Sequence, residues 1–343
     1  MSHILPFTEF GKDDAPIAGG KGASLGEMTQ VGISVPPGFV VTATLFDRFL
    51  EETDLNVEVD TQLHSVDTAQ MHTVEQASAK IQNRIRKEEM PEDIKEEIFK
   101  AFDVLGTDLV AVRSSATSED SADAAWAGQL DSFMNITREN VAYTVQQCWA
   151  SLFTPRAIFY RFEKNLHKEK ISVAVVVQKM VKSDISGIAF SVHPVTEDHN
   201  QMIFEAGWGF GDAVVSGSIT PDSYVVEKEP KNIIDINVST QEKMLVRKSS
   251  EQDSDPEWGE NVWTGVPGDK KDKQKLTENQ IFELSELVQK IENHYGFPCD
   301  IEWAVEGEKF YITQSRPITT LANAKSPMKE DEKESEISKK KIQ

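Results

Sequence analysis

The chain has 343 residues, of which 57 are acidic and 36 basic, so its formal net charge is −21. This length allows two domains or two lobes of one domain, and the acidic balance argues against a nucleic-acid or anionic-membrane partner, because no basic patch stands out. Its two cysteines, Cys148 and Cys299, lack metal-ligand spacing, and no apolar run reaches membrane-spanning length. We therefore expect a cytoplasmic protein without a signal peptide.

The first segment of interest is Ile17 to Met28, IAGGKGASLGEM, in which Lys21 lies between glycines. It is typical of a loop that leads into a helix, where the free N–H groups and the helix dipole favour a phosphate. It is not a P-loop, which has a longer glycine spacing and Ser or Thr directly after the lysine. The alternative is a flexible turn with an exposed lysine.

A short strand after a Pro-Pro-Gly corner and a helix capped near Thr42 or Thr44 come next. Residues 60 to 105 are polar, with isoleucines and phenylalanines largely three or four positions apart. This spacing predicts covering helices without chemistry of their own.

The stretch VAVRSSATSEDSADAAWAGQLDSFMNI, Val110 to Ile136, starts as an apolar strand and continues as a loop rich in Ser, Ala and acids. Arg113 at the strand end has the fork of donors that suits a phosphate, and backbone N–H groups of such a loop can surround an anion. Glu119 and Asp120 receive no firm role, because acids beside an anion site need a cation between them or must face solvent. The alternative is a solvated turn with one surface arginine.

Asn140 to Leu152 and Pro155 to Lys164 have the pattern of two amphipathic helices. The β-branched run Ser172 to Val181 then predicts a strand buried on both faces. Gln178 interrupts this run and must find polar partners, for which an adenine edge and a structural carbonyl are both suitable.

Two further strands, within Ser186 to Val195 and Gln201 to Gly217, surround a second glycine-rich loop, GWGFGD. The spacing of its glycines does not match the dinucleotide-binding fingerprint, because the position of the third glycine is taken by Asp212. We therefore reject a dinucleotide fold.

Leu276 to Tyr295 is predicted to be a helix that a Thr277–Gln280 capping box begins and Gly296 ends. The segment DIEWAVEGEKFYITQSRP after it alternates like a β-hairpin. The tail from Lys325 has mixed charges without apolar periodicity and is predicted to be disordered.

We expect the hairpin loop to have three residues centred on Glu308, which places Glu302 opposite Gln314 and puts both on one face with Arg316. A carboxylate beside an amide oxygen suits Mg²⁺ that bridges phosphate oxygens, while the arginine holds the phosphate. The alternative is a solvent-facing polar side with an ordinary ion pair.

Four of these blocks together resemble a known family: GGKGASLGEM, VAVRSSATSEDSADAAWAGQ, the strand with Gln178, and DIEWAVEG followed by FYITQSRPITTL. They are similar to the nucleotide-binding domain shared by phosphoenolpyruvate synthase, pyruvate phosphate dikinase and rifampin phosphotransferase. The likeness runs in family order from about residue 8 to residue 321. It implies an α+β, ATP-grasp-like fold whose two lobes, residues 1–190 and 191–321, clasp ATP and Mg²⁺, with a disordered tail at 322–343.

The resemblance also implies a role for each matching residue. Contacts with phosphate are implied for Lys21, Arg113 and Arg316, which would act in catalysis. The phosphate-covering loop would contain Gly128 and Ser132, the latter in place of the threonine of many relatives, Gln178 would lie near the adenine, and Mg²⁺ would be held by Glu302 and Gln314.

Family members pass a phosphoryl group from ATP to a histidine on a swivelling domain and from there to pyruvate or an antibiotic, leaving AMP. None of the seven histidines lies in the Gly/Thr-rich setting of that histidine. We therefore predict the ATP-binding component of a dikinase-type phosphotransferase that needs a separate histidine-bearing domain or chain. The alternatives are the corresponding component of a rifampin phosphotransferase-like antibiotic kinase and a non-catalytic ATP sensor.

Overall fold

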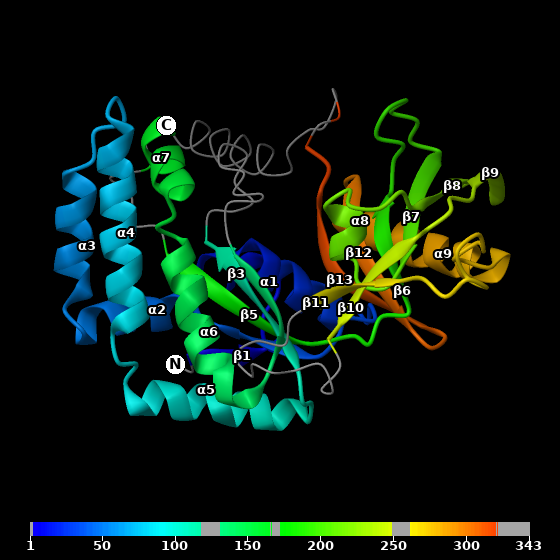
Figure 1. Cartoon of the computed structure of the whole chain (residues 1–343). Helices are drawn as coiled ribbons and strands as arrows, with labels where there is room; N and C mark the ends of the chain where they lie inside the picture. Colours follow the sequence, from blue (N-terminus) through cyan, green and yellow to red (C-terminus); the bar gives the residue numbers. More distant parts are fainter. Residues whose placement is uncertain are drawn as a thin grey trace, which may run out of the picture. The chain divides into compact units, whose positions relative to one another are not determined.

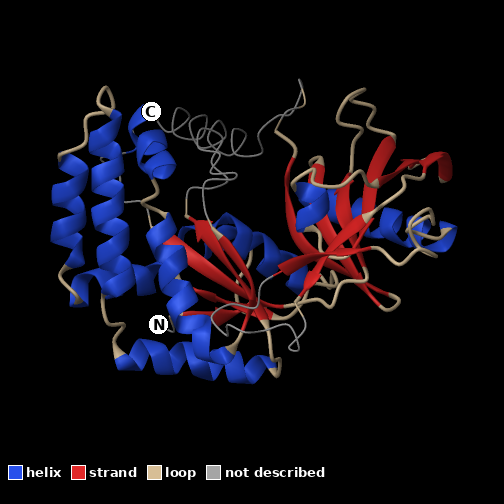
Figure 2. Cartoon of the chain, viewed as in Figure 1, coloured by secondary structure: helices blue, strands red, loops and turns tan. Residues whose placement is uncertain are grey.

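The computed structural model of the chain describes residues 3–117, 131–164, 166, 172–248, 261–319 and 321. These residues form two compact units. The first runs to Val181 and takes in Arg247–Val262, and the second holds Lys182–Val246 and the chain from Trp263 onward. The mixture of helices and sheets in both units confirms the predicted α+β class (Figures 1 and 2).

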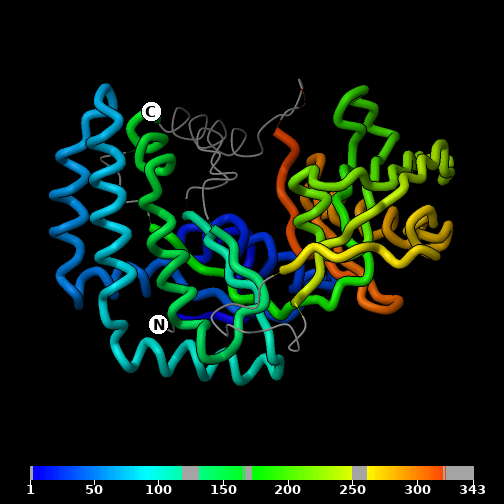
Figure 3. Tube along the Cα trace, viewed as in Figure 1, coloured from blue at the N-terminus to red at the C-terminus, as the bar shows by residue number. Residues whose placement is uncertain are grey.

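The first unit is built on a five-stranded antiparallel sheet in the order β1-β2-β5-β3-β4. Its strands are β1 (Ile4–Pro6), β2 (Gly38–Val41), β3 (Val110–Ala116), β4 (Ser132–Ile136) and β5 (Val173–Lys179). Strands far apart in the sequence thus become neighbours, as β2 and β5 do in the trace of Figure 3.

Helices cover this sheet on both faces. The helix on one face is α1 (Ala15–Gln30), which follows the short 3₁₀ turn Lys12–Asp14. The hydrophobic core on the other face, which includes Phe39, Val112 and Val177, is completed by residues of six helices. These are α2 (Ala43–Glu52), α3 (Leu55–His64), α4 (Met71–Lys87), α5 (Glu92–Leu105), α6 (Arg138–Ser151) and α7 (Pro155–Glu163).

Because both faces are covered, β5 is buried from Val173 to Gln178. This confirms the strand predicted from its β-branched run. The covering helices predicted between residues 60 and 105 are likewise present as the end of α3, α4 and α5.

The second unit contains a six-stranded antiparallel sheet in the order β13-β12-β6-β7-β8-β9. The strands are β6 (Ile185–Phe190), β7 (Gln201–Trp208), β8 (Asp222–Glu227), β9 (Asn232–Asn237), β12 (Cys299–Glu306) and β13 (Lys309–Pro317). The short helix α8 (Asp212–Val215) also belongs to this unit. A two-stranded ribbon of β10 (Lys243–Arg247) and β11 (Asn261–Gly265) has residues in both units.

The long helix α9 (Glu278–Tyr295) of the second unit has the predicted ends. Gln280 N–H donates to Thr277 Oγ1 at 3.3 Å, and Thr277 N–H donates to Gln280 Oε1 at 3.0 Å, which is the reciprocal capping box. Gly296 ends the helix in the left-handed conformation with φ 74°.

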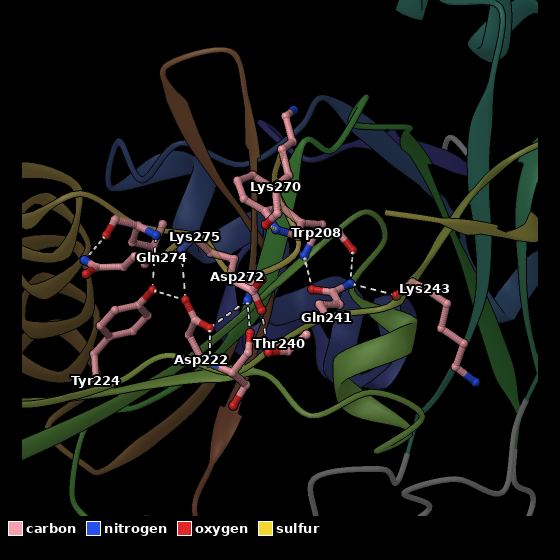
Figure 4. Close-up of polar contacts among 12 residues, drawn as sticks. Trp208, Asp222, Tyr224, Thr240, Gln241, Lys243, Lys270, Asp272, Gln274 and Lys275 are labelled. Atoms are coloured by element: carbon pink, nitrogen blue, oxygen red, sulfur yellow. Dashed lines mark hydrogen bonds and ion pairs between the residues drawn. The ribbon is translucent and has the colours of Figure 1, made fainter. Parts of the chain in front are cut away.

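A buried ion pair ties the start of α9 to β8. Lys275 Nζ lies 2.7 Å from Asp222 Oδ1, and both side chains are fully buried. The Asp222 carboxylate also accepts hydrogen bonds from the Tyr224 hydroxyl at 2.9 Å and from Ser239 N–H at 2.9 Å (Figure 4). Such a pair is tolerated in the interior because further hydrogen bonds satisfy it.

The structure contains no helix, within its described part, that is long and apolar enough to cross a membrane. The loop residues Glu119, Asp120 and Gly128 and the predicted disordered tail at 322–343 lie outside the described residues.

Candidate functional site

Helix α1 is interrupted at Gly19, whose φ of 69° and ψ of 168° are not helical. The predicted glycine loop ahead of a helix is therefore shorter than expected, since α1 already begins at Ala15 and resumes after this one residue. A Cβ atom at Gly19 would collide with both Oγ and the carbonyl oxygen of Ser115. Only glycine fits here, because the position combines a left-handed φ with a close backbone approach.

The turn after Gly19 contains Lys21 and lies against the end of β3. Lys21 Nζ donates to the carbonyl oxygen of Ser114 at 3.1 Å, and Gly22 N–H donates to Ser115 Oγ at 3.2 Å. Lys21, which was predicted to contact phosphate, is thus bound to Ser114, the residue next to Arg113 in β3. Because this segment is helical apart from Gly19 and is hydrogen-bonded to β3, it is not the flexible turn considered as the alternative.

Arg113 on β3 lies directly opposite Ser132 on β4 and pairs with Val176 on its other side. Directly paired residues of antiparallel strands share a face of the sheet. This is the face that α1 covers, because a Cβ at Gly22 would lie 3.7 Å from Val176 Cγ2. Arg113 is buried there, and Ser132 is exposed.

Gln178 lies on the same face, two residues along β5 from Val176. It is buried, and its Nε2 donates to the Pro36 carbonyl oxygen at 3.4 Å. The Gln178 amide therefore has the structural carbonyl that was one of its two expected partners. A contact between Gln178 and adenine stays a prediction.

The first unit therefore gathers its described site residues on one face of its sheet. Lys21 comes from the helix that covers this face, and the other three come from three adjacent strands: Arg113, Ser132 and Gln178.

In the second unit, β12 and β13 form the predicted hairpin, but its loop is shorter than expected. Glu306 pairs with Lys309, so the loop has two residues, and the prediction of a three-residue loop was wrong. The predicted pairing of Glu302 with Gln314 is nevertheless present, because a bulge between Trp303 and Glu302 shifts the register by one residue.

The two faces of β12 differ in burial. Ile301, Trp303 and Val305 are buried in the core, whereas Asp300 and Glu302 are half-buried on the opposite face. Since Gln314 and Arg316 pair with Glu302 and Asp300, all four polar side chains belong to this half-buried face.

Asp300 is the site residue that inspection of the sequence missed. Its Oδ2 accepts from Arg316 Nε at 2.9 Å and lies 2.8 Å from the second guanidinium nitrogen. Burial raises the pKa of the Asp300 carboxyl, and the nearby Arg316 opposes this shift. The alternating pattern contained the signal, because Asp300 lies two residues before Glu302 and opposite Arg316. The ordinary ion pair considered as an alternative is thus present beside the candidate metal ligands.

Glu302 and Gln314 are direct cross-strand partners, so a carboxylate and an amide start from neighbouring positions on one face. Oxygen donors of this kind suit Mg²⁺. Within the described ranges, no three His, Cys, Asp or Glu side chains gather closely enough to hold a metal ion. Mg²⁺ in proteins is usually bound by one or two carboxylates together with substrate phosphates and water. The residues present therefore fit a metal that arrives with a phosphorylated ligand.

Comparison with known proteins gives a matching family and several sequence relatives. Residues 15–337 match the family model described as pyruvate phosphate dikinase, AMP/ATP-binding domain. Sequence relatives include a probable phosphoenolpyruvate synthase of Methanocaldococcus jannaschii, 44% identical over 98% of this chain and 28% of its own length. Another is the probable phosphoenolpyruvate synthase of Methanothermobacter thermautotrophicus, 44% identical over 94% of this chain and 47% of its own.

The phosphoenolpyruvate synthase of Pyrococcus furiosus is 38% identical over 92% of this chain and 43% of its own length. The chain thus spans less than half the length of each of these three relatives. A solved structure of D-alanine–D-alanine ligase from Helicobacter pylori aligns with 66% of this chain and 48% of its own, at 13% identity and a TM-score of 0.28. That score is too low to carry an argument.

Proposed function

Since the chain belongs to the family of pyruvate phosphate dikinase AMP/ATP-binding domains, as its motifs predicted, we propose that it is the ATP-binding component of a phosphotransferase. It passes one phosphoryl group from ATP, through a histidine on a separate domain or chain, to pyruvate, and the second phosphoryl group goes to water, so that AMP and phosphate are the other products. The observation that carries this proposal is the position of Lys21 relative to Arg113. Arg113 lies on the sheet face that α1 covers, and Lys21 of α1 donates to the carbonyl oxygen of Ser114, the next residue of β3.

Two cations held in this way suit the triphosphate of ATP. Phosphoryl transfer depends on positioning and on charge stabilisation more than on covalent chemistry. Arg113 offers a planar fork of donors, and Lys21 adds a compact charge. Ser132, exposed and opposite Arg113, presents a hydroxyl to the same phosphates.

The half-buried face of the β12–β13 hairpin carries groups that suit a phosphate and its metal ion. Glu302 and Gln314 would hold Mg²⁺, which supplies neutralisation of phosphate charge when bound. Arg316 would contact a phosphate, and its ion pair with Asp300 restricts the positions of its guanidinium.

The chain spans less than half of each of the three relatives named above, and we propose that a separate domain or chain supplies the histidine and the pyruvate site. A cytoplasmic location is consistent with Cys148 and Cys299, which are both buried and free.

Calorimetric titration with ATP and Mg²⁺, followed by an assay of AMP formation with a histidine-bearing domain of a relative, tests this function. We expect Arg113→Ala to lower AMP formation roughly 100-fold or more, the scale of losing one preorganised donor. Arg138→Ala, which removes an exposed arginine paired with Asp103, is the matched control and should retain activity. Absence of ATP binding by the unaltered chain would refute the proposal, and ATP binding without any AMP formation would instead indicate a sensor.

A further inference from the structure

Ser115 occupies a special position at the end of β3. It is fully buried and lies two residues after Arg113, so both side chains belong to the face that α1 covers. Its hydroxyl accepts the hydrogen bond from Gly22 N–H at 3.2 Å. No role was assigned to it from the sequence.

The hydroxyl acts as a helix cap supplied from another part of the chain. Gly22 is the third residue after the break at Gly19, and N–H groups in the first turn of a helix generally lack a carbonyl of a preceding turn to bond. Such groups are usually capped by a serine or threonine at the helix start itself. Here the cap comes from a residue 93 positions away in the sequence, and Gly19 lies against the same serine.

The turn that Ser115 holds is the one that contains Lys21. Lys21 Nζ in turn donates to the carbonyl oxygen of Ser114 at 3.1 Å. Three consecutive residues of β3 therefore connect the two candidate phosphate-binding side chains of this unit. Arg113 is the first of them, and Ser114 and Ser115 hold the turn that contains Lys21.

We propose that Ser115 is a positioning residue that sets the place of Lys21 relative to Arg113 for binding of the ATP phosphates. This inference rests on the proposed function, since it concerns the same site. Charge stabilisation of phosphate is effective only when the donors are held before the ligand arrives. Removal of the Ser115 hydroxyl leaves Gly22 N–H without this acceptor and removes one of the two hydrogen bonds described above between the turn and β3.

A double-mutant cycle tests the inference, with the dissociation constant of ATP·Mg²⁺ measured by calorimetry for Ser115→Ala, Lys21→Met and the double variant. We expect Ser115→Ala to weaken binding about tenfold, the scale of one buried hydrogen bond. Because Ser115 acts through Lys21, the double variant should bind ATP within about twofold of Lys21→Met alone. Independent effects that multiply would overturn the inference, as a general structural role predicts them.

Ser78→Ala is the control for loss of a buried hydroxyl. Ser78 in α4 is buried, and its hydroxyl accepts a hydrogen bond from Gln82 Nε2 at 2.7 Å. We expect this variant to lower the melting temperature and to bind ATP as the unaltered chain does. Equal losses of ATP affinity in Ser78→Ala and Ser115→Ala would also overturn the inference.

Ser115→Cys repeats the cycle with nearly unchanged side-chain volume, in case the alanine variant does not fold. A thiol is a weak acceptor, so the same loss and the same coupling to Lys21 are expected. If the unaltered chain does not bind ATP·Mg²⁺, the proposed function fails; if it binds and the cycle shows no coupling, only the inference about Ser115 fails.

Discussion

Glu302 on β12 lies directly opposite Gln314 on β13, although a strict count from the two-residue loop would place Glu302 opposite Thr313. The bulge inserts one residue into β13 and so returns Gln314 to the half-buried face. The candidate metal ligands therefore depend on an irregularity of the hairpin, a kind of feature that often re-aims side chains beside functional sites.

The carboxylate of Glu302 is expected to bind ATP through the metal. Glu302→Gln keeps the shape of the side chain but removes its charge, so affinity for ATP in the presence of Mg²⁺ should fall at least about tenfold. Affinity for ATP with a chelator present should change much less. Glu306→Gln, four residues further on the same strand and opposite Lys309, is the control and should resemble the unaltered chain in both titrations.

Gly19→Ala is expected to disturb the Lys21 turn for two reasons. The substitution forces alanine to adopt φ 69° with ψ 168°, a region almost restricted to glycine, which costs about 1–3 kcal/mol, and it drives Cβ into Ser115. Gly32→Ala is matched to it, because Gly32 has φ 73° but no atom within 4 Å of the added Cβ. Urea unfolding should show a larger loss of stability for Gly19→Ala, and ATP affinity should fall only in that variant; equal behaviour would contradict the steric argument.

The buried ion pair predicts a large cost for breaking one side of it. Lys275→Met leaves Asp222 buried without its cation, and the free energy of unfolding should fall by about 3–5 kcal/mol. Lys273→Met breaks an exposed pair with Asp269 and should cost less than about 1 kcal/mol. The double variant Asp222→Asn/Lys275→Met removes both charges, so urea unfolding should show recovery of part of the loss.

Glu205 on β7 is half-buried, and burial raises the pKa of its carboxyl. The unfolded chain therefore loses this proton at lower pH than the folded chain, and the Glu205 contribution to stability falls as the pH rises through that window. Glu205→Gln does not titrate. Its free energy of unfolding, measured in urea from about pH 4 to pH 7, should decline less with rising pH than that of the unaltered chain; parallel curves would contradict the burial argument.

Local patterns in the sequence predicted much of this architecture. The β-branched run of β5 and the capping box of α9 depend on nearby residues, so periodicity and spacing identify them. The pairing of Glu302 with Gln314 was predicted from a three-residue loop and is present only because the bulge offsets the shorter loop. The four motif blocks, which contain Lys21, Arg113, Gln178 and the Glu302–Arg316 hairpin, together predicted the family, which the match over residues 15–337 confirms.

Contacts between segments far apart in the sequence could not be predicted from periodicity and spacing. In the sequence, nothing distinguishes Ser115 from the other serines of its Ser-rich run, and only the fold brings it into contact with Gly19 and Gly22. In the same way, only the fold brings Lys275 to Asp222. The sequence alone determined which residues alternate, which segments are helical and which motifs carry charge for a nucleotide. Only the tertiary structure decided which of those groups hold one another, because hydrogen bonds and close packing depend on distances that sequence spacing does not specify.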